Sequence, residues 1–285
     1  MLDLKIRKMR DNLPKISIVM PCLNSVDFIE RSIRSVIEQE YKNIELFIKD
    51  GGSSDGTLEI IRHYAKKYPR LLRWISEKDK GQADAINKGM KKVNGDILTH
   101  LNADDVYKEG ALRKVSEYFM KNPNVMWAYG KADIINANDK EIRRWITLYK
   151  NFWLKNYSYN TLLVLNYISS MACFWRKEAA KEVGESDINQ PFVIDYHYWL
   201  RLGKKYKAGV INEYLSSFRI SYSNKSSIAF VKQFQDEFNV AKRFTNNNLI
   251  LFLHLLHYNL IIFIYSILKI IKNFTSRNSN IQGSA

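Results

Sequence analysis

The feature that most constrains the fold is a regular alternation of apolar runs and amphipathic segments between residues 15 and 121. Short runs rich in β-branched or other apolar residues predict strands at 15–20, 44–48, 71–75 and 97–101. Helical spacing of apolar side chains predicts helices at 27–39, 55–68, 82–93 and 109–121. Strands that alternate with helices of this length are typical of βαβ units. We therefore predict an α/β fold with a mainly parallel central sheet flanked by helices.

The chain is less regular after residue 121. Strands are predicted at 125–130, 141–148 and 172–176, and helices at 195–206 and 228–246. No linker-like stretch separates the two halves, and 46% hydrophobic and 13% aromatic residues are ample for a packed core. We predict one domain over 1–227 and a helical, apolar C-terminal extension over 228–285.

Polar sequences follow each of the four strands predicted before residue 121. They lie at Pro21–Asn24, Lys49–Thr57, Ser76–Gly89 and Asn102–Asp105. Turns are rich in such residues, so one of these sequences alone says little. In open parallel sheets, however, ligands bind outside the carboxyl ends of the strands. Four polar sequences at one edge of the sheet therefore predict a site for a polar ligand.

Asp104 and Asp105 are adjacent, so each raises the cost of ionising the other. A loop or helix-cap role would suit Asp at these positions. The alternative is a bound cation that offsets both charges. The chain has neither the G-x-G-x-x-G sequence after its first strand nor a P-loop, so phosphates would need a metal to bridge them. Mg²⁺ and Mn²⁺ prefer carboxylate and phosphate oxygens, and we predict one of them as the cofactor.

Six sequences in fixed order carry a resemblance to a known family. They are ISIVMPCLN, FIKDGGSSDGT, SEKDKGQADAINKG, LNADDVY, ACFWRKEAAKEVG and VIDYHYWLRLGKKY. Together they resemble the family 2 inverting glycosyltransferases of GT-A fold over residues 16–227. The resemblance implies a Rossmann-like fold with a nucleotide-binding half at 15–121 and an acceptor half at 122–227. It also implies metal-dependent transfer, with inversion, of a hexosyl or N-acetylhexosaminyl group from a nucleoside diphosphate donor, with UDP-sugars the first choice.

The resemblance implies roles for the residues that match these sequences. Asp195 would be the catalytic base, and Asp104 and Asp105 would hold the metal. Elementary chemistry agrees, because transfer needs one carboxylate for the acceptor proton and a positive charge on the departing diphosphate. The residues implied in donor binding are Pro21, Asn24, Asp50, Gly51, Lys80, Asp84, Asn102, Ala103 and Asp104.

Structural interpretations remain open for several of these residues. Asp195 also suits a helix N-cap, Asp84 a first-turn helix acid, Asp50 a turn former and Lys80 a solvated surface position. Two other functions stay open for the whole chain. One is a nucleotidyltransferase or sugar-nucleotide pyrophosphorylase, and the other is a basic nucleic-acid-binding protein. We rank the second lowest, because the positive charge is spread along the chain, and we expect no nucleic-acid partner.

Several positions depart from the family pattern. Asp50 is followed by Gly51 where many relatives have a second Asp, so the preference for one nucleotide base in the donor is open. Asn102 stands where the metal-binding D-x-D sequence begins with an acid. Ser221 or Tyr222 takes the place of a frequent His. The Q-x-x-R-W sequence of processive synthases is absent, so we expect a single addition per encounter with a lipid-linked or cell-surface glycan of bacteria, such as lipopolysaccharide.

The C-terminal region is basic and apolar. The net charge is +15, and residues 201–285 carry 12 Lys and Arg against 3 Asp and Glu. Residues 249–271 are nearly all apolar, with a polar stripe at His254, Tyr258, Tyr265, Lys269 and Lys272. This pattern predicts a membrane-associated helix at 249–272 that lies in the interface. A membrane span, a homo-oligomer contact and a core helix stay open.

The N-terminal sequence MLDLKIRKMRDNLPK has no apolar core, so we expect no signal peptide. The two cysteines, Cys22 and Cys173, have no metal-type spacing and are expected to be free thiols. Together these features predict a cytoplasmic protein at the inner face of the cell membrane, either peripheral or anchored.

Overall fold

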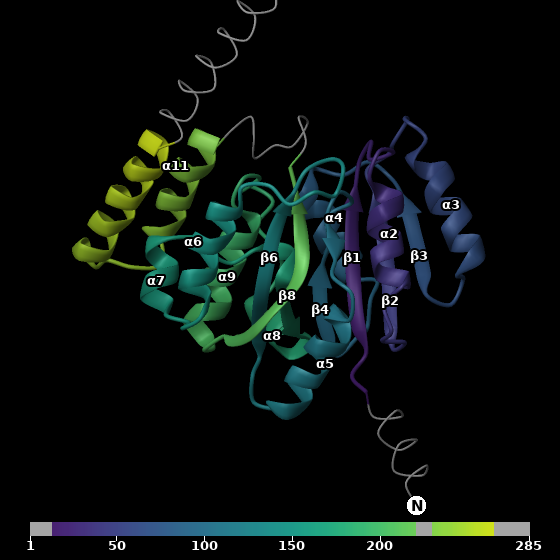
Figure 1. Ribbon diagram of the computed structural model, residues 1–285, viewed down its shortest axis with the longest axis horizontal. Helices are drawn as coiled ribbons and strands as arrows, with labels where there is room; N and C mark the ends of the chain where they lie inside the picture. The colour runs from purple at the N-terminus through teal and green to yellow at the C-terminus, as the bar shows by residue number, and fades with distance from the viewer. Residues whose placement is uncertain (1–12, 221–229, 265–285) are drawn as a thin grey trace, which may run out of the picture.

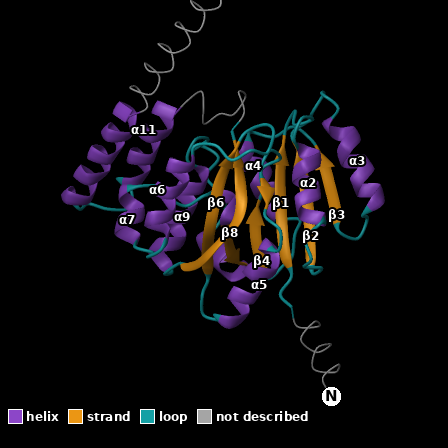
Figure 2. Cartoon of the chain, in the orientation of Figure 1, coloured by secondary structure: helices purple, strands orange, loops and turns teal. Residues whose placement is uncertain are grey.

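A mixed eight-stranded sheet forms the centre of the computed structural model, which describes residues 13–220 and 230–264. The strand order is β3-β2-β1-β4-β7-β6-β8-β5. Figure 2 shows the sheet in orange with helices on both sides. The strands are β1 (Ile16–Cys22), β2 (Ile44–Asp50), β3 (Leu72–Ser76), β4 (Ile97–His100), β5 (Val106–Tyr107), β6 (Trp127–Ile135), β7 (Cys173–Arg176) and β8 (Gly209–Arg219).

The predicted βαβ half is confirmed. Strands β3, β2, β1 and β4 pair in parallel, and every residue of β1 and β2 is buried. A strand buried on both faces needs apolar residues at successive positions, which explains runs such as ISIVM. The helices of this half are α2 (Ile29–Ile37), α3 (Thr57–Lys67), α4 (Gln82–Met90) and α5 (Ala111–Lys121).

Successive side chains of β1 point to opposite faces of the sheet and enter two separate cores. Ile16, Ile18 and Met20 pack with α2, α3 and α5 on one face. Val19 packs on the other face, in a core that includes residues of the second half of the chain. The helices of that half are α6 (Arg144–Leu154), α7 (Tyr159–Val164), α8 (Lys177–Val183), α9 (Ile194–Lys205) and α11 (Phe230–Ala241), with a 3₁₀ turn, η1, at Ser170–Ala172.

The second half differs from the prediction in two respects. The sheet is mixed there, because β7 runs antiparallel to β4 and β6, and β5 runs antiparallel to β8. The strand predicted at 141–148 is wrong, since most of this segment belongs to helix α6. The buried residues of α6 are Thr147, Asn151 and Leu154, which recur at helical spacing, whereas Leu148 and Phe152 are exposed. The apolar residues that suggested a strand are therefore on the surface of a helix.

Residues 248–264 form a further helix beside α7 and α11, drawn in yellow in Figure 1. His254 is its buried anchor, with Nδ1 2.7 Å from the Leu163 carbonyl oxygen and its ring against Phe238. Among the described residues, no helix is both long enough and apolar enough to cross a membrane. The rest of the predicted membrane helix, at 265–272, and the predicted domain boundary after 227 lie outside the described residues.

Candidate active site

The loops after β1 and β2 are joined by hydrogen bonds at the carboxyl edge of the sheet. Asn24, in a left-handed conformation with φ of 48°, accepts a bond from the Ser54 backbone at 3.0 Å and donates from its own N–H to Ser53 Oγ at 2.8 Å. Short polar side chains tolerate this conformation better than most. The structure thus brings Asn24 and the end of β1, where Pro21 lies, next to the loop that follows Asp50.

Asp50 has a fully buried carboxylate whose oxygens are occupied by protein donors. Its Oδ2 accepts bonds from the backbone of Gly52 and Ser53 at 2.9 and 3.0 Å and from Ser76 Oγ at 2.6 Å. Its Oδ1 accepts bonds from Ser53 Oγ and Cys22 Sγ. Burial alone would raise the pKa of Asp50, but the hydrogen bonds from Ser53 and Ser76 hold it below its ordinary value. A carboxylate with these partners has no lone pair left for a ligand.

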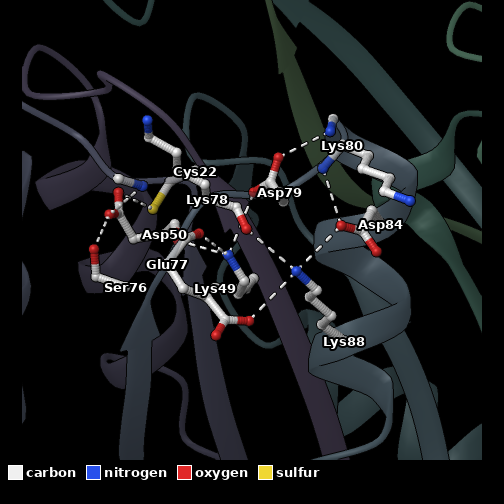
Figure 3. Close-up of polar contacts among 12 residues, drawn as sticks. Cys22, Lys49, Asp50, Ser76, Glu77, Lys78, Asp79, Lys80, Asp84 and Lys88 are labelled. Atoms are coloured by element: carbon white, nitrogen blue, oxygen red, sulfur yellow. Dashed lines mark hydrogen bonds and ion pairs between the residues drawn. The ribbon is translucent and has the colours of Figure 1, made fainter.

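Lys49, near the end of β2, forms an ion pair with Asp79 in the loop after β3 (Figure 3). Lys49 Nζ lies 3.4 Å from Asp79 Oδ2 and donates to the carbonyl oxygens of Asp50 and Glu77 at 2.7 and 2.6 Å. Its side chain has no exposed surface, so these partners are needed to stabilise a buried charge. Sequence reasoning missed this pair. The available signal was a lysine inside a strand otherwise suited to full burial.

Lys80 and Asp84 meet at the start of α4. The backbone N–H of Lys80 donates to Asp84 Oδ2 at 2.9 Å, and Lys88 Nζ lies 3.2 Å from the same oxygen. The bond from Lys80 lowers the pKa of Asp84. The Lys80 side chain is exposed. Asp84 therefore acts as a first-turn acid of α4, and Lys80 is left at the surface of the same sheet edge.

A chain of hydrogen bonds fixes the loop that holds the acidic pair. Gln82 Nε2 donates to Asn102 Oδ1 at 2.6 Å, and Asn102 Nδ2 donates to Asp105 Oδ2 at 2.9 Å. The backbone N–H of Arg219 donates to Asp105 Oδ1 at 2.9 Å. In the same loop, Ala103 is buried and its carbonyl oxygen accepts from Ser32 Oγ at 2.8 Å. The side chains of Asn102 and Asp105 are thus held before any ligand arrives.

Asp105 is fully buried, whereas Asp104 is half-buried. Burial and the adjacent charge of Asp104 raise the pKa of Asp105 well above its ordinary value. This is the situation that a cation would relieve. The described residues include no group of three or more His, Cys, Asp or Glu side chains that could hold a metal. The two carboxylates suit Mg²⁺ or Mn²⁺ where phosphate oxygens supply further ligands, as is usual for Mg²⁺.

Arg219, at the end of β8, supports this loop from the other side, and sequence reasoning missed it. Its Nε donates to the Asp104 carbonyl oxygen at 2.7 Å, and a second guanidinium nitrogen donates to the Asn136 carbonyl oxygen at 2.8 Å. It also pairs with Asp139 at 2.6 Å, and its guanidinium lies 5.0 Å from the centre of the Phe28 ring. The side chain is fully buried, so it fixes the Asp104 backbone against the end of β8.

Asp195 lies in the first turn of α9 and lines a pocket together with His100, the last residue of β4. Strands β4 and β7 are antiparallel, which places Cys173, the first residue of β7, opposite the end of β4. Thr99 Oγ1 donates to the Cys173 carbonyl oxygen at 2.9 Å, and the charge of Asp195 contributes to the raised pKa of the Cys173 thiol. Asn102 to Asp105 follow β4 directly. Asp195 and the acidic pair therefore both lie near the carboxyl end of β4.

The pocket that Asp195 lines has a volume of about 300 Å³ and is bounded by α4, β4, α8 and α9. Burial raises the pKa of Asp195, while the hydrogen bond from the Tyr196 backbone at 2.8 Å and the charge of Lys150 act in the opposite direction. A carboxylate with a raised pKa that is still stabilised as an anion is suited to proton abstraction.

Two further charged residues, both missed from the sequence, lie near Asp195. Lys150 comes from α6. Burial lowers its pKa, and the charges of Asp195 and Glu237 act in the opposite direction. Glu237 comes from α11, and burial raises its pKa to about 7. Asn166 and Gln233 each donate to Glu237 Oε1 at 3.2 Å. Residues from three separate helices thus set the electrostatics around Asp195.

Comparisons with known proteins agree with this arrangement. The model of "Glycosyl transferase family 2" matches residues 17–184. The Escherichia coli UDP-Glc:alpha-D-GlcNAc-diphosphoundecaprenol beta-1,3-glucosyltransferase WfgD is 30% identical over 248 residues, which are 85% of this chain and 91% of WfgD. The family match sets aside the pyrophosphorylase and nucleic-acid-binder alternatives.

Solved structures show the same fold. The mannosyltransferase PcManGT from Pyrobaculum calidifontis, in complex with GDP-Man and Mn²⁺, has a TM-score of 0.66 at 17% identity, covering 88% of this chain and 70% of that one. S. aureus TarS 1-349 in complex with UDP has a TM-score of 0.58 at 15% identity, covering 79% of this chain and 65% of that one. This chain spans 39% of the longer TarS structure. With its family model matched over more than half of its length, the chain belongs to glycosyltransferase family 2 and is a glycosyltransferase of GT-A fold.

Proposed function

We propose that this enzyme is a metal-dependent, inverting, non-processive glycosyltransferase. It moves a hexosyl or N-acetylhexosaminyl group from a nucleoside diphosphate donor, in the first place a UDP-sugar, to a hydroxyl of a lipid-linked or cell-surface glycan. The observation that carries the proposal is that Asp195 lines a pocket with His100, the last residue of β4, and that the Asp104–Asp105 pair follows β4 directly. The names of WfgD, which acts on a diphosphoundecaprenol-linked sugar, and of the UDP-bound TarS structure support the donor and acceptor classes.

Asp195 would take the proton of the acceptor hydroxyl. Its raised pKa makes it a stronger base than an ordinary aspartate, and the charge of Lys150 favours its ionised form. A single base opposite the leaving group directs attack from the far side of the anomeric carbon, and this inverts its configuration. A cation held by Asp104 and Asp105 would stabilise the charge of the departing diphosphate. Asn102 and the Arg219 backbone would hold the Asp105 carboxylate in place for that ion, and the Arg219 side chain would hold the Asp104 backbone.

The donor would lie across the ends of β1 to β4. Pro21 and Asn24 border the nucleoside end, and the exposed Lys80 side chain is suited to the diphosphate or the sugar. Asp84 would position Lys80 through its backbone bond rather than touch the donor. Asp50 would shape the floor with Gly51, since its oxygens are already occupied.

The membrane surface is the proposed location of the acceptor reaction. Tyr149 Oη lies 2.8 Å from His257 Nε2, so α6 and the helix 248–264 are neighbours. Both helices expose large apolar side chains: Trp145, Leu148 and Phe152 on α6, and Leu249, Phe252, Leu253, Leu256, Leu260 and Phe263 on the C-terminal helix. Exposed apolar clusters of this size mark interaction surfaces. Beside a basic C-terminal sequence, this surface fits an anionic lipid bilayer.

The experiment that tests the proposal is a thermal-stability screen of nucleotide sugars with and without Mn²⁺. A bound donor stabilises the folded protein by mass action and so raises the melting temperature. At a donor concentration of a hundred times Kd, the free energy of unfolding rises by about 2.7 kcal/mol. We expect UDP-sugars to stabilise the protein only when Mn²⁺ or Mg²⁺ is present. The stabilising donor is then assayed for transfer to a diphosphoundecaprenol-linked saccharide, and the configuration of the product is read by NMR. Equal stabilisation by the donor with and without the metal would contradict the metal role.

A further inference from the structure

The pocket that Asp195 lines is also lined by side chains whose buried nitrogen atoms lack partners. Its volume of about 300 Å³ is at the lower end of the range for ligand pockets. His100, Trp175 and Trp199 line it, and each is 6% exposed or less. Their atoms His100 Nδ1, Trp175 Nε1 and Trp199 Nε1 have no hydrogen-bond partner among the described residues. Because a buried polar group without a partner costs stability, three of them at one pocket indicate that a ligand or water completes them.

A neighbouring tryptophan outside the pocket has its partner within the chain. Trp127 is fully buried, and its Nε1 donates to the Tyr206 carbonyl oxygen at 2.9 Å. Its ring stacks on that of Trp199, which in turn lies 5.6 Å from the ring of Trp175. Of these three adjoining indoles, the two without a partner are therefore the two that line the pocket.

The chemistry of these side chains restricts the ligand. An indole N–H can only donate, so the ligand needs an acceptor oxygen. An anion is disfavoured, because the Asp195 carboxylate lines the same pocket and burial lowers the pKa of His100 to about 4, which leaves its ring neutral. The three lysines that line the pocket are exposed or half-buried, so they can keep their charges in water.

Much of the remaining wall is apolar. It includes Ile86 and Met90 from α4, Leu98 from β4 and Ala180 from α8. A neutral group that combines a carbonyl oxygen, an N–H and a methyl matches this wall. The oxygen accepts an indole N–H, the N–H donates to the neutral ring of His100, and the methyl contacts the apolar side chains. This group is an acetamido group, whereas a hydroxyl in its place would lose the apolar contact.

We propose that this pocket recognises the acetamido group of an N-acetylhexosamine, with the indole N–H of Trp175 or Trp199 donating to its carbonyl oxygen. This inference rests on the proposed glycosyl transfer. The N-acetylhexosamine is either the transferred sugar or the terminal sugar of the acceptor, since both lie next to the base Asp195 during transfer. Water alone in the pocket would give no preference for an acetamido sugar, so this preference is the readout.

The test has two arms that distinguish the donor from the acceptor. In the first, the full chain with Mn²⁺ is titrated calorimetrically with UDP-GlcNAc and UDP-GalNAc, and with UDP-Glc and UDP-Gal. In the second, kcat/KM is measured for diphosphoundecaprenol acceptors that end in GlcNAc, GalNAc, Glc or Gal. We expect a preference of about 10- to 100-fold for the acetamido sugar in one arm, from a hydrogen bond and a buried methyl group.

Variants that remove only the indole N–H test the assignment to this pocket. W175F and W199F keep an aromatic ring, and at least one of them should reduce the preference by about 3- to 10-fold, the worth of a neutral hydrogen bond. W127F is the matched control, because its N–H is used within the chain, and its preference should be unchanged. A180F fills the pocket from α8 without removing a nitrogen, and it should also reduce the preference. The melting temperature of each variant identifies any loss that comes from unfolding.

The contrary outcomes separate this inference from the proposed function. Sugar transfer by the unaltered enzyme with no acetamido preference in either arm refutes the inference alone. An acetamido preference that persists in W175F, W199F and A180F assigns the recognition to another site and also refutes it. If the unaltered protein neither binds a nucleotide sugar nor transfers one, the proposed function is refuted, and this inference falls with it.

Discussion

Asn102 donates a hydrogen bond from Nδ2 to Asp105 Oδ2 at 2.9 Å, and this bond ties a neutral side chain to the buried member of the acidic pair. Asn102 stands where the family's metal-binding sequence begins with an acid. A third carboxylate here would add repulsion next to a carboxyl whose pKa is already raised. The amide instead holds Asp105 by donating to it, and its own oxygen is held by Gln82.

The metal role of the pair predicts different effects of D105N in the two ligand states. Without metal, the variant removes a charge that burial opposes and can still accept from the Arg219 backbone, but its NH2 group faces the NH2 group of Asn102, so the melting temperature should change little. With Mn²⁺ and UDP, the stabilisation should fall by most of its value, because one of the two anionic ligands is lost. Thermal unfolding with and without Mn²⁺ and UDP measures both effects. An unchanged response to Mn²⁺ would remove Asp105 from the metal site.

Asp195 as general base predicts a loss of rate without a loss of donor affinity. D195N should lower kcat by about 10²- to 10⁴-fold, the usual contribution of a positioned base, and leave the Kd of the UDP-sugar within about twofold. Rapid-quench transfer assays and calorimetry measure the two quantities separately. A loss of donor affinity with kcat retained would assign Asp195 to donor binding instead.

Lys150 predicts a shift in the pH profile of the same reaction. Its charge lowers the pKa of Asp195, so K150M should move the acidic limb of kcat to higher pH and reduce activity below that limb. Lys155, five residues further along at the C-terminal end of α6 and exposed, provides the control K155M. Identical pH profiles for K150M and the unaltered enzyme would show that Lys150 does not tune the base.

Much of the fold follows from the sequence because the first half is locally consistent. In β1, β2 and α2 the hydrophobic period, the strand length and the turn residues indicate the same structure, so local rules were sufficient. Helix α6 was misassigned because several of its apolar side chains are exposed instead of buried in the core. Its buried residues include Thr147 and Asn151, which are polar and do not contribute to a pattern of apolar residues. The order of the polar sequences predicts a site at the carboxyl edge of the parallel strands, and the structure brings these loops together there.

The contacts inside the site could not be predicted, since they join distant positions. Asp79 meets Gly51, Arg219 meets Asp104, and Glu237 enters from a helix that sequence reasoning treated as an extension. Nothing in the residue types at these positions reveals such pairings before the chain is folded. Asp50 illustrates the converse: its sequence suggests a ligand contact, and its hydrogen bonds show a carboxylate already occupied by its own loop and by Ser76 of β3.

Glu237 predicts a pH dependence of stability. Its pKa is raised to about 7 in the folded state, so the folded protein binds its proton more tightly than the unfolded chain does. This contribution is complete at low pH and is lost as the pH rises from about 4.3, the ordinary Glu value, through 7. E237Q should therefore gain up to about 3 kcal/mol over the unaltered protein at pH 8, and much less at pH 5.

Urea unfolding at pH 5 and pH 8 measures this difference. D236N is the matched control, because Asp236 is the adjacent acid and pairs with Lys232 on the same helix. Its effect on the free energy of unfolding should not change in this direction between the two pH values. If E237Q and the unaltered protein lose stability in parallel as the pH rises, Glu237 does not titrate in this range.

The apolar surface of α6 and the C-terminal helix predicts binding to anionic membranes. Phe152 and Phe263 are 67% and 63% exposed, and each would transfer apolar area from water to lipid on binding. Replacing both with Ser should weaken binding to vesicles that contain phosphatidylglycerol by about 30- to 700-fold, given about 1.5–3 kcal/mol for a fully buried Phe and about two thirds of each side chain exposed before binding. M120S on α5 is the control, since Met120 is 43% exposed but belongs to a helix on the other face of the sheet.

Because part of the attraction is electrostatic, binding of the unaltered protein should also weaken with salt and with neutral lipid. Equal vesicle binding by the Ser variant and the unaltered protein would show that this surface serves another partner, and a second copy of the chain would be detected by its concentration-dependent sedimentation.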